Sequence, residues 1–263
     1  LARGVDMVIT CLPSPDVSAR VMEGADGVLK GLGQGQIWLE MSTTESEEVQ
    51  RVGEQVAARG ATPLDAPVSG GCHRAATGNI SVFVGGERAG FEAAFPALQC
   101  MGRRILHTGP LGSASVLKVI TNYLASVHLA ALGEAWAVAE KAGMDLRTTY
   151  EAIAASSGTS FVHETESQVI LNGSYDINFT LDLVRKDIGL FRALAERHAV
   201  PADVVGVTSD IFADAEARYG GRAWSPMVVK RLEDDCGIRL RAPGFPAQMV
   251  DEEAEEPGRE VTP

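Results

Sequence analysis

A lysine and an asparagine stand four residues apart in a long apolar stretch, at Lys118 and Asn122. In a helix this spacing puts an amine and an amide on one face. An ammonium group among apolar side chains loses hydration, which lowers its pKa toward the range where it can both give and take a proton. The pair therefore predicts proton transfer beside a small substrate, with Lys118 as the acid or base. The alternative is a lysine that extends to water at a helix edge.

The second chemical feature is the turn Ser69-Gly70-Gly71, which follows the strand residues Asp65-Ala-Pro-Val68. Ligands of α/β sheets bind at the carboxyl ends of strands. Consecutive N–H groups without side chains form a concavity that binds anions. We therefore expect the turn to hold the carboxylate of a small anionic substrate. Taken alone, the same residues also fit an ordinary flexible loop.

Two further pairs, Leu12-Pro13 and Ser42-Thr43, also follow predicted strands and fall at the same sheet edge. Lys186, on a predicted helix, could bind a cofactor phosphate or carboxamide. The alternative for Lys186 is a local ion pair with Asp182 or Asp187.

Strands and helices alternate in the first part of the chain. The predicted strands are Val5–Leu12, Gln36–Met41, Thr62–Val68, Ser81–Val84 and Arg104–Thr108. This alternation predicts an α/β fold with a partial Rossmann-like parallel sheet. After Gly109 the pattern is helical throughout, beginning with a long helix at Ser113–Ala142. We expect a dinucleotide-binding domain at 1–109, an all-helical domain at 110–241 and an acidic disordered tail at 242–263.

Composition excludes several classes of protein. The net charge of −12 argues against a nucleic-acid partner, and no uninterrupted apolar run reaches the ~20 residues of a membrane span. The four cysteines have neither metal-ligand spacing nor a disulfide framework. We expect reduced thiols, no metal site and a cytoplasmic protein.

Taken together, these motifs resemble the β-hydroxyacid dehydrogenases, which include 3-hydroxyisobutyrate dehydrogenase and tartronate semialdehyde reductase. The resemblance runs to about Leu240 and depends on the order and spacing of several segments: Asp6–Pro13, Met41–Thr43, Asp65–Gly71, Gly78 with Val84–Gly86, Gly109–Asn122 and Lys186-Asp187.

The resemblance implies an oxidoreductase that transfers a hydride between NAD or NADP and a small 3-hydroxy acid or its semialdehyde. It implies that Lys118 is the catalytic proton donor or acceptor. Substrate binding falls on Ser69, Gly70, Gly71 and Asn122. Cofactor binding falls on Leu12, Pro13, Thr43 and Lys186.

Two departures from the family pattern stand out. No Gly-x-Gly-x-x-Gly turn precedes the first strand. We expect an N-terminally truncated fragment that lacks about 60 residues, at about 30 per βαβ unit, and binds dinucleotide poorly. The second departure, Cys72-His73-Arg74, adds positive charge beside the turn and suggests a further anionic or hydroxylated group on the substrate.

The resemblance also implies a homodimer or homotetramer assembled through the helical domain. Two alternatives share the fold: an imine reductase and a non-catalytic dimerisation scaffold. Relatives of either kind normally lack the lysine, so Lys118 favours the dehydrogenase.

Overall fold

The computed structural model describes residues 2–262, which form two compact units. Unit 1 runs to Ile120 and includes the segment from Asp251 onward, and unit 2 is Thr121–Val250. The boundary thus lies within the long helix α5 (Ser113–Lys141) rather than at the expected 109/110. The reason is that the first turn of α5 is bound to a buried carboxylate of unit 1, as described below.

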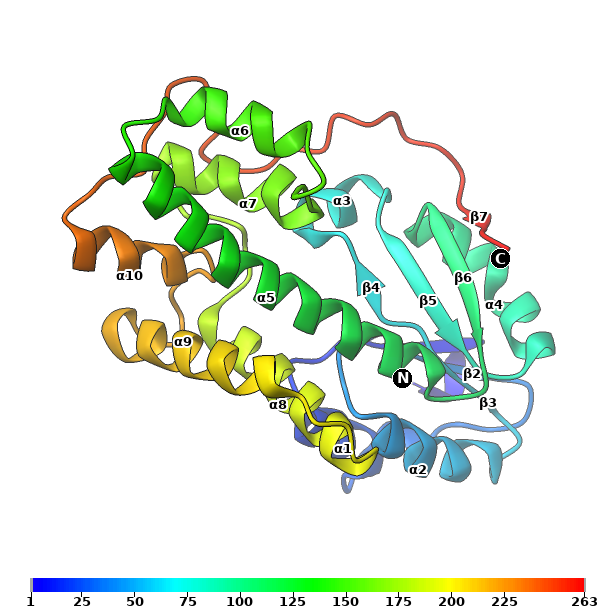
Figure 1. Cartoon of the computed structure of the whole chain (residues 1–263). Coiled ribbons are helices and arrows are strands. Elements are labelled where there is room, and N and C mark those ends of the chain that lie inside the picture. Colours follow the sequence, from blue (N-terminus) through cyan, green and yellow to red (C-terminus); the bar gives the residue numbers. More distant parts are fainter. Residues whose placement is uncertain (1, 263) are drawn as a thin grey trace. The chain divides into compact units, whose positions relative to one another are not determined.

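Unit 1 contains a seven-stranded sheet with helices in the connections (Figure 1). Its strands are β1 (Met7–Thr10), β2 (Ile37–Glu40), β3 (Thr62–Asp65), β4 (Val68–Ser69), β5 (Ser81–Gly85), β6 (Arg104–Gly109) and β7 (Arg259–Glu260). Its other elements are η1 (Ala2–Gly4), α1 (Pro15–Glu23), η2 (Val28–Lys30), α2 (Ser46–Ala57), α3 (Gly71–Thr77) and α4 (Arg88–Met101).

The sheet is mostly parallel, as the sequence predicted. Its order is β1-β2-β3-β5-β6-β7, with β4 paired to β5. One difference is that β5 pairs antiparallel with both β3 and β4. The short connection through β4 and α3 returns the chain in the opposite direction, because a parallel return needs a longer crossover.

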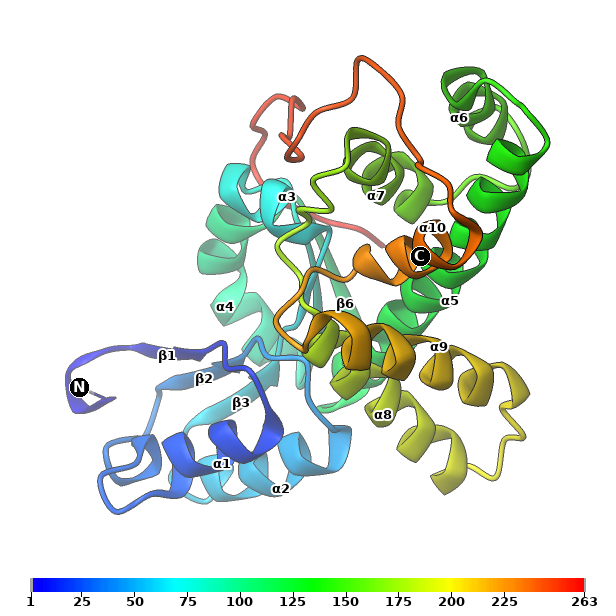
Figure 2. The same ribbon diagram turned by 90° about the vertical axis from the view of Figure 1, so that its left-hand side faces the viewer.

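Both faces of the sheet are buried, which explains why its strands read as continuous apolar runs. All four residues of β2 are buried. Trp38 packs with α1 and α2 in one cluster, whereas Ile37 and Leu39 pack with α4 in another. Figure 2 shows α1 and α2 together on one side of β1–β3.

The end of the chain differs from the disordered tail that the sequence predicted. Residues from Asp251 onward belong to unit 1, and β7 adds a parallel strand to β6. The peptide N–H groups of Arg259 and Val261 donate to Arg103 O and Ile105 O, at 2.9 and 2.8 Å. The acidic residues of this segment do not repel it from the sheet, because arginines of unit 1 bind them.

Unit 2 is helical, as predicted. It contains the rest of α5 together with α6 (Leu146–Ala154), α7 (Phe161–Asn172), α8 (Leu181–Arg197), α9 (Asp203–Tyr219) and α10 (Met227–Cys236). Asp145 caps α6 through a 2.7 Å hydrogen bond from the Thr148 N–H. These helices enclose one apolar cluster that includes Trp136, Leu181 and Phe212.

A buried hydrogen-bond relay crosses this cluster. Trp136 Nε1 donates to Ser167 Oγ at 3.1 Å, and Ser167 Oγ lies 3.2 Å from His163 Nδ1. His163 Nε2 lies 3.0 Å from the Tyr150 carbonyl oxygen, which can only accept, so this nitrogen carries the proton. Burial lowers the pKa of His163, and the relay satisfies a neutral imidazole.

Helix α5 is long and apolar enough to span a membrane by length and composition alone. The search for an uninterrupted apolar run did not identify α5 as a possible span, because polar residues occur at intervals along the helix. Core helices of globular proteins meet the same criterion, but here only 28% of the qualifying window is buried.

Candidate functional site

The position of Lys118 is fixed by a buried carboxylate at the end of β3. Asp65 is fully buried, and its Oδ1 accepts from Gly112 N at 2.8 Å. Its Oδ2 accepts from Ser115 N at 2.7 Å and from Ser115 Oγ at 2.9 Å. These donors belong to the N-terminal end of α5, so one side chain ties the helix to the sheet. Burial raises the pKa of Asp65, although the three hydrogen bonds oppose that shift.

Lys118 lies one turn beyond Ser115 and is buried, with 8% of its surface exposed. The alternative of a lysine extended into water is therefore wrong. Asn122 follows one turn later on the same helix, as its spacing predicted.

The turn Ser69-Gly70-Gly71 joins β4 directly to α3, a short helix that the sequence did not reveal. Gly70 and Gly71 have φ angles of 137° and 82°, which only glycine adopts without strain. The neighbouring side chains also require glycine here. A side chain at Gly71 would approach the His73 ring to 2.9 Å, and one at Gly70 would approach Arg74 Cδ to 3.3 Å.

A buried polar network holds the ends of β1 and β2 together. Glu40 accepts from Thr10 Oγ1 at 2.9 Å and from Ser42 N at 2.8 Å. Ser42 Oγ in turn accepts from Leu12 N at 2.7 Å. The loops that carry Leu12-Pro13 and Thr43 are thereby fixed side by side at the carboxyl ends of two parallel strands. Such an edge fits one part of a dinucleotide.

In unit 2, one buried carboxylate binds both of the predicted polar side chains. Asn122 Nδ2 donates to Asp187 Oδ2 at 2.6 Å. Lys186 Nζ lies 2.9 Å from Asp187 Oδ1 as an ion pair. The local pairing that the sequence left open for Lys186 is present, and its cofactor role stays a prediction.

The structure thus brings the predicted residues together in groups. Unit 1 holds Lys118, the Ser69–Gly71 turn and the Leu12 and Thr43 loops, whereas Asn122 and Lys186 meet on Asp187 in unit 2. Of the carboxylates that position them, only Asp187 was anticipated from the sequence, as a local partner of Lys186, and Glu40 and Asp65 were not. The sequence does hold a signal for Glu40: an acidic residue that ends the apolar run Ile37-Trp-Leu must be buried with hydrogen-bond partners.

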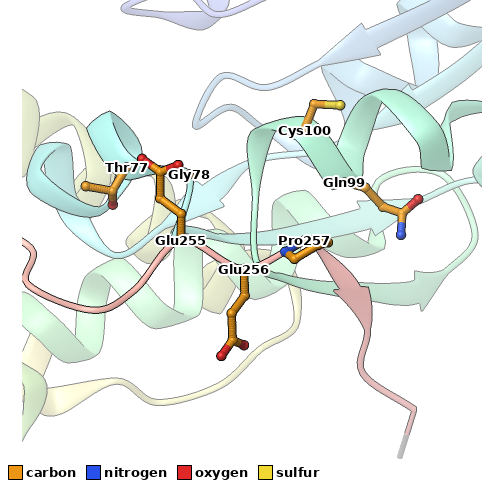
Figure 3. Close-up of a pocket in the computed structure, with 7 residues that line it drawn as sticks. All are labelled: Thr77, Gly78, Gln99, Cys100, Glu255, Glu256 and Pro257. Atoms are coloured by element: carbon orange, nitrogen blue, oxygen red, sulfur yellow. The ribbon is translucent and has the colours of Figure 1, made fainter.

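A separate hollow of about 310 Å³ lies beside α3, α4 and the C-terminal segment (Figure 3). It is lined by Thr77, Gly78, Gln99, Cys100, Glu255, Glu256 and Pro257. None of these is a predicted site residue, and two carboxylates in the wall disfavour an anionic substrate. The hollow is therefore not the predicted substrate site.

Comparisons with known proteins match both parts of the chain. Residues 1–109 match the NAD-binding domain of 6-phosphogluconate dehydrogenase, and residues 112–232 match the NAD-binding domain of NADP-dependent 3-hydroxyisobutyrate dehydrogenase. The chain is 31% identical to 2-(hydroxymethyl)glutarate dehydrogenase of Eubacterium barkeri, over 91% of this chain and 80% of that protein. It is 34% identical to 3-hydroxyisobutyrate dehydrogenase of Pseudomonas aeruginosa, over 84% and 78%.

A solved structure of 3-hydroxyisobutyrate dehydrogenase from Salmonella typhimurium superposes with a TM-score of 0.80 at 28% identity. The match covers 88% of this chain and 81% of that one. An imine reductase from Myxococcus stipitatus, at 17% identity and a TM-score of 0.54, shares the fold. With the buried lysine, the glycine turn and the two matched domains in the same order, the chain belongs to the β-hydroxyacid dehydrogenase family of NAD(P)-dependent oxidoreductases.

Proposed function

We propose that this protein interconverts a small 3-hydroxy acid and its semialdehyde or keto partner with NAD or NADP. The observation that carries the proposal is the buried Lys118 on α5, a helix whose first turn is bound by Asp65 at the end of β3. A structural lysine has no need of burial, whereas a proton donor gains from it because water is excluded from the reacting atoms.

Each group of residues has one task in this proposal. The peptide N–H groups of Ser69–Gly71 bind the substrate carboxylate, and Asn122 orients the substrate. Lys118 Nζ gives a proton to the carbonyl oxygen during reduction or takes it from the hydroxyl during oxidation. Leu12, Pro13, Thr43 and Lys186 contact the cofactor. When bound, NAD(P) supplies or accepts the hydride, and the protein contributes placement and charge.

Lys118→Ala tests the proton-transfer role. We expect kcat to fall by about 10²–10⁴-fold, the usual contribution of general acid–base catalysis, with the Kd of the cofactor unchanged. Lys141→Ala, at the exposed end of the same helix, removes an equal charge and serves as the control. Retained turnover in Lys118→Ala would refute the assignment.

The assay needs two forms of the protein. Residues 1–263 contain no Gly-x-Gly-x-x-Gly turn, which is the usual cradle for a pyrophosphate. Chain 1–263 is therefore compared with protein extended by any in-frame coding sequence that precedes Leu1. Fluorescence titration with NADH and NADPH, followed by a panel of semialdehydes, separates the dehydrogenase from a non-catalytic scaffold, and cyclic imines test for an imine reductase.

We also propose that the protein is a homodimer or homotetramer. Apolar residues lie exposed on two helices of unit 2, at Leu124 and Val138 on α5 and at Val204 and Val207 on α9. Exposed apolar side chains that repeat along helices are typical of an assembly surface.

A further inference from the structure

Glu253, in the C-terminal segment, pairs with Arg74, whose side chain lies beside the turn Ser69–Gly71 of unit 1. We propose that Glu253 is a counter-ion that sets the charge of the substrate accepted at Ser69–Gly71, so that monocarboxylates are preferred over dicarboxylates. This inference rests on the proposed function, because it names the charge class of the same substrate.

Arg74 is the group through which Glu253 acts. Its side chain covers Gly70, since a Cβ there would lie 3.3 Å from Arg74 Cδ and 3.6 Å from Arg74 Cβ. The guanidinium begins one bond beyond Cδ and thus lies beside the turn. Without a counter-ion, such a group would bind a second carboxylate of the substrate in a charge-assisted, bidentate manner.

Glu253 holds this guanidinium. Its Oε1 lies 2.9 Å from Arg74 Nη2, and its Oε2 lies 2.6 Å from Arg103 Nη1. The backbone of the segment is held as well, because the buried Asn79 donates to Glu253 O at 3.0 Å and to Asp251 Oδ2 at 2.7 Å. Isolated surface ion pairs are weak, but here Asn79 holds the backbone of Glu253 and two arginines bind its carboxylate.

The balance of charge around the turn points the same way. Arg74 pairs with Glu253, and Arg103 pairs with both Glu253 and Glu256. Asp251, which Asn79 binds, adds a third carboxylate. Burial lowers the pKa of His73, the other basic group beside the turn, and Arg74 lowers it further. A second carboxylate on the substrate therefore finds no uncompensated cation in this cluster. The carboxylates of the cluster repel it and so disfavour a dicarboxylate substrate.

Three variants test the proposal. Glu253→Gln removes the charge from a side chain that is half exposed, so the fold should persist. Glu252→Gln, the matched control, removes the same charge from an exposed neighbour. The double variant Glu253→Gln/Arg74→Met removes the guanidinium as well.

Binding of two unreactive probes, butyrate and glutarate, is measured by calorimetry. Wild type and Glu252→Gln should bind butyrate more tightly. Glu253→Gln should shift the ratio of the glutarate affinity to the butyrate affinity at least tenfold toward glutarate. The double variant Glu253→Gln/Arg74→Met should lose this gain. Equal ratios in Glu253→Gln and Glu252→Gln, or no binding of either probe to any of these proteins, would overturn the proposal.

Turnover of 3-hydroxyisobutyrate and 2-(hydroxymethyl)glutarate is measured in parallel, since the two differ by one carboxylate arm. If Glu253→Gln shifts binding as expected but neither substrate is turned over, the dehydrogenase activity is refuted and the counter-ion role of Glu253 is supported. If the substrates are turned over but Glu253→Gln leaves the charge selectivity unchanged, the dehydrogenase activity is supported and the role of Glu253 is refuted.

Discussion

Asp65 links strand and helix at the scale of a single residue. Its carboxylate accepts three hydrogen bonds from the first turn of α5, and both of its oxygens are used. A negative charge at a helix N-terminus is also favoured by the helix dipole. The position of Lys118 relative to the sheet therefore depends on this one side chain.

Asp65→Asn should be more harmful than loss of a single bond. The amide keeps one acceptor but turns an N–H₂ group toward peptide donors, which leaves buried N–H groups unsatisfied. We expect a loss of about 2–4 kcal/mol in the free energy of unfolding, against about 1 kcal/mol for Ser115→Ala, which removes one hydroxyl donor. Urea denaturation measures both, and equal losses would contradict the role of Asp65.

The chemical residues could be read from the sequence, whereas their partners could not. Lys118 and Asn122 are close in the chain, and helical spacing alone places them on one face. Asp65 and Glu40 act on residues far away in the sequence, with separations of 47 to 50 positions for Asp65 and 30 for the Thr10–Glu40 bond. Only the folded sheet brings such groups together.

At the scale of elements, α7 carries a carboxyl group without a partner. Glu166 lies on the side of α7 that also presents Val162, Val169 and Ile170 to the core. Its Oε2 is inaccessible and has no hydrogen-bond partner. Burial raises the pKa of Glu166 to about 8, so the folded protein keeps this carboxyl protonated at neutral pH.

This shift predicts a pH-dependent stability. The unfolded chain ionises Glu166 near pH 4.5, whereas the folded chain retains the proton until about pH 8. Stability should therefore fall as pH rises toward 8, by about 2 kcal/mol between pH 6.5 and 8 at 1.36 kcal/mol per unit. His163 does not contribute to the change in stability between pH 6.5 and 8, because burial lowers its pKa from the usual 6.5.

Glu166→Gln is the matched variant for a denaturation series at pH 6.5, 7.2 and 8. The amide cannot ionise, so the slope with pH should disappear and the variant should exceed wild type in stability at pH 8. An unchanged slope would show that another group is responsible.

The pattern of apolar residues predicted those strands and helices that bury apolar side chains in a core. Strands β1, β2, β3, β5 and β6 and helix α5 all overlap the predicted segments. The short helix α3 was missed because Gly71–Thr77 has no apolar face and no buried residue. Strand β7 was missed because its two residues, Arg259 and Glu260, are both charged and are held by pairing to β6.

At the scale of the whole molecule, the exposed apolar residues of unit 2 predict an assembly. Val204 and Val207 are 53% and 63% exposed and lie on one side of α9. Val207→Glu should lower the mass measured by light scattering toward the 27.8 kDa of one chain, because a buried unpaired charge opposes association. Thr159→Glu adds the same charge elsewhere on unit 2, and a mass equally altered in both would exclude this surface.

The return of the chain to unit 1 at Asp251 has a consequence for biosynthesis. Strand β6 pairs with β5 earlier, but it gains its second neighbour, β7, only when residues 259 and 260 have left the ribosome, after all of unit 2 has been made. Until then the nascent sheet has an open edge, which is a hazard for aggregation. Pausing of translation just before the codons for residues 259 and 260, or a bulky insertion next to them, should therefore lower the soluble yield before it affects any property of the finished protein.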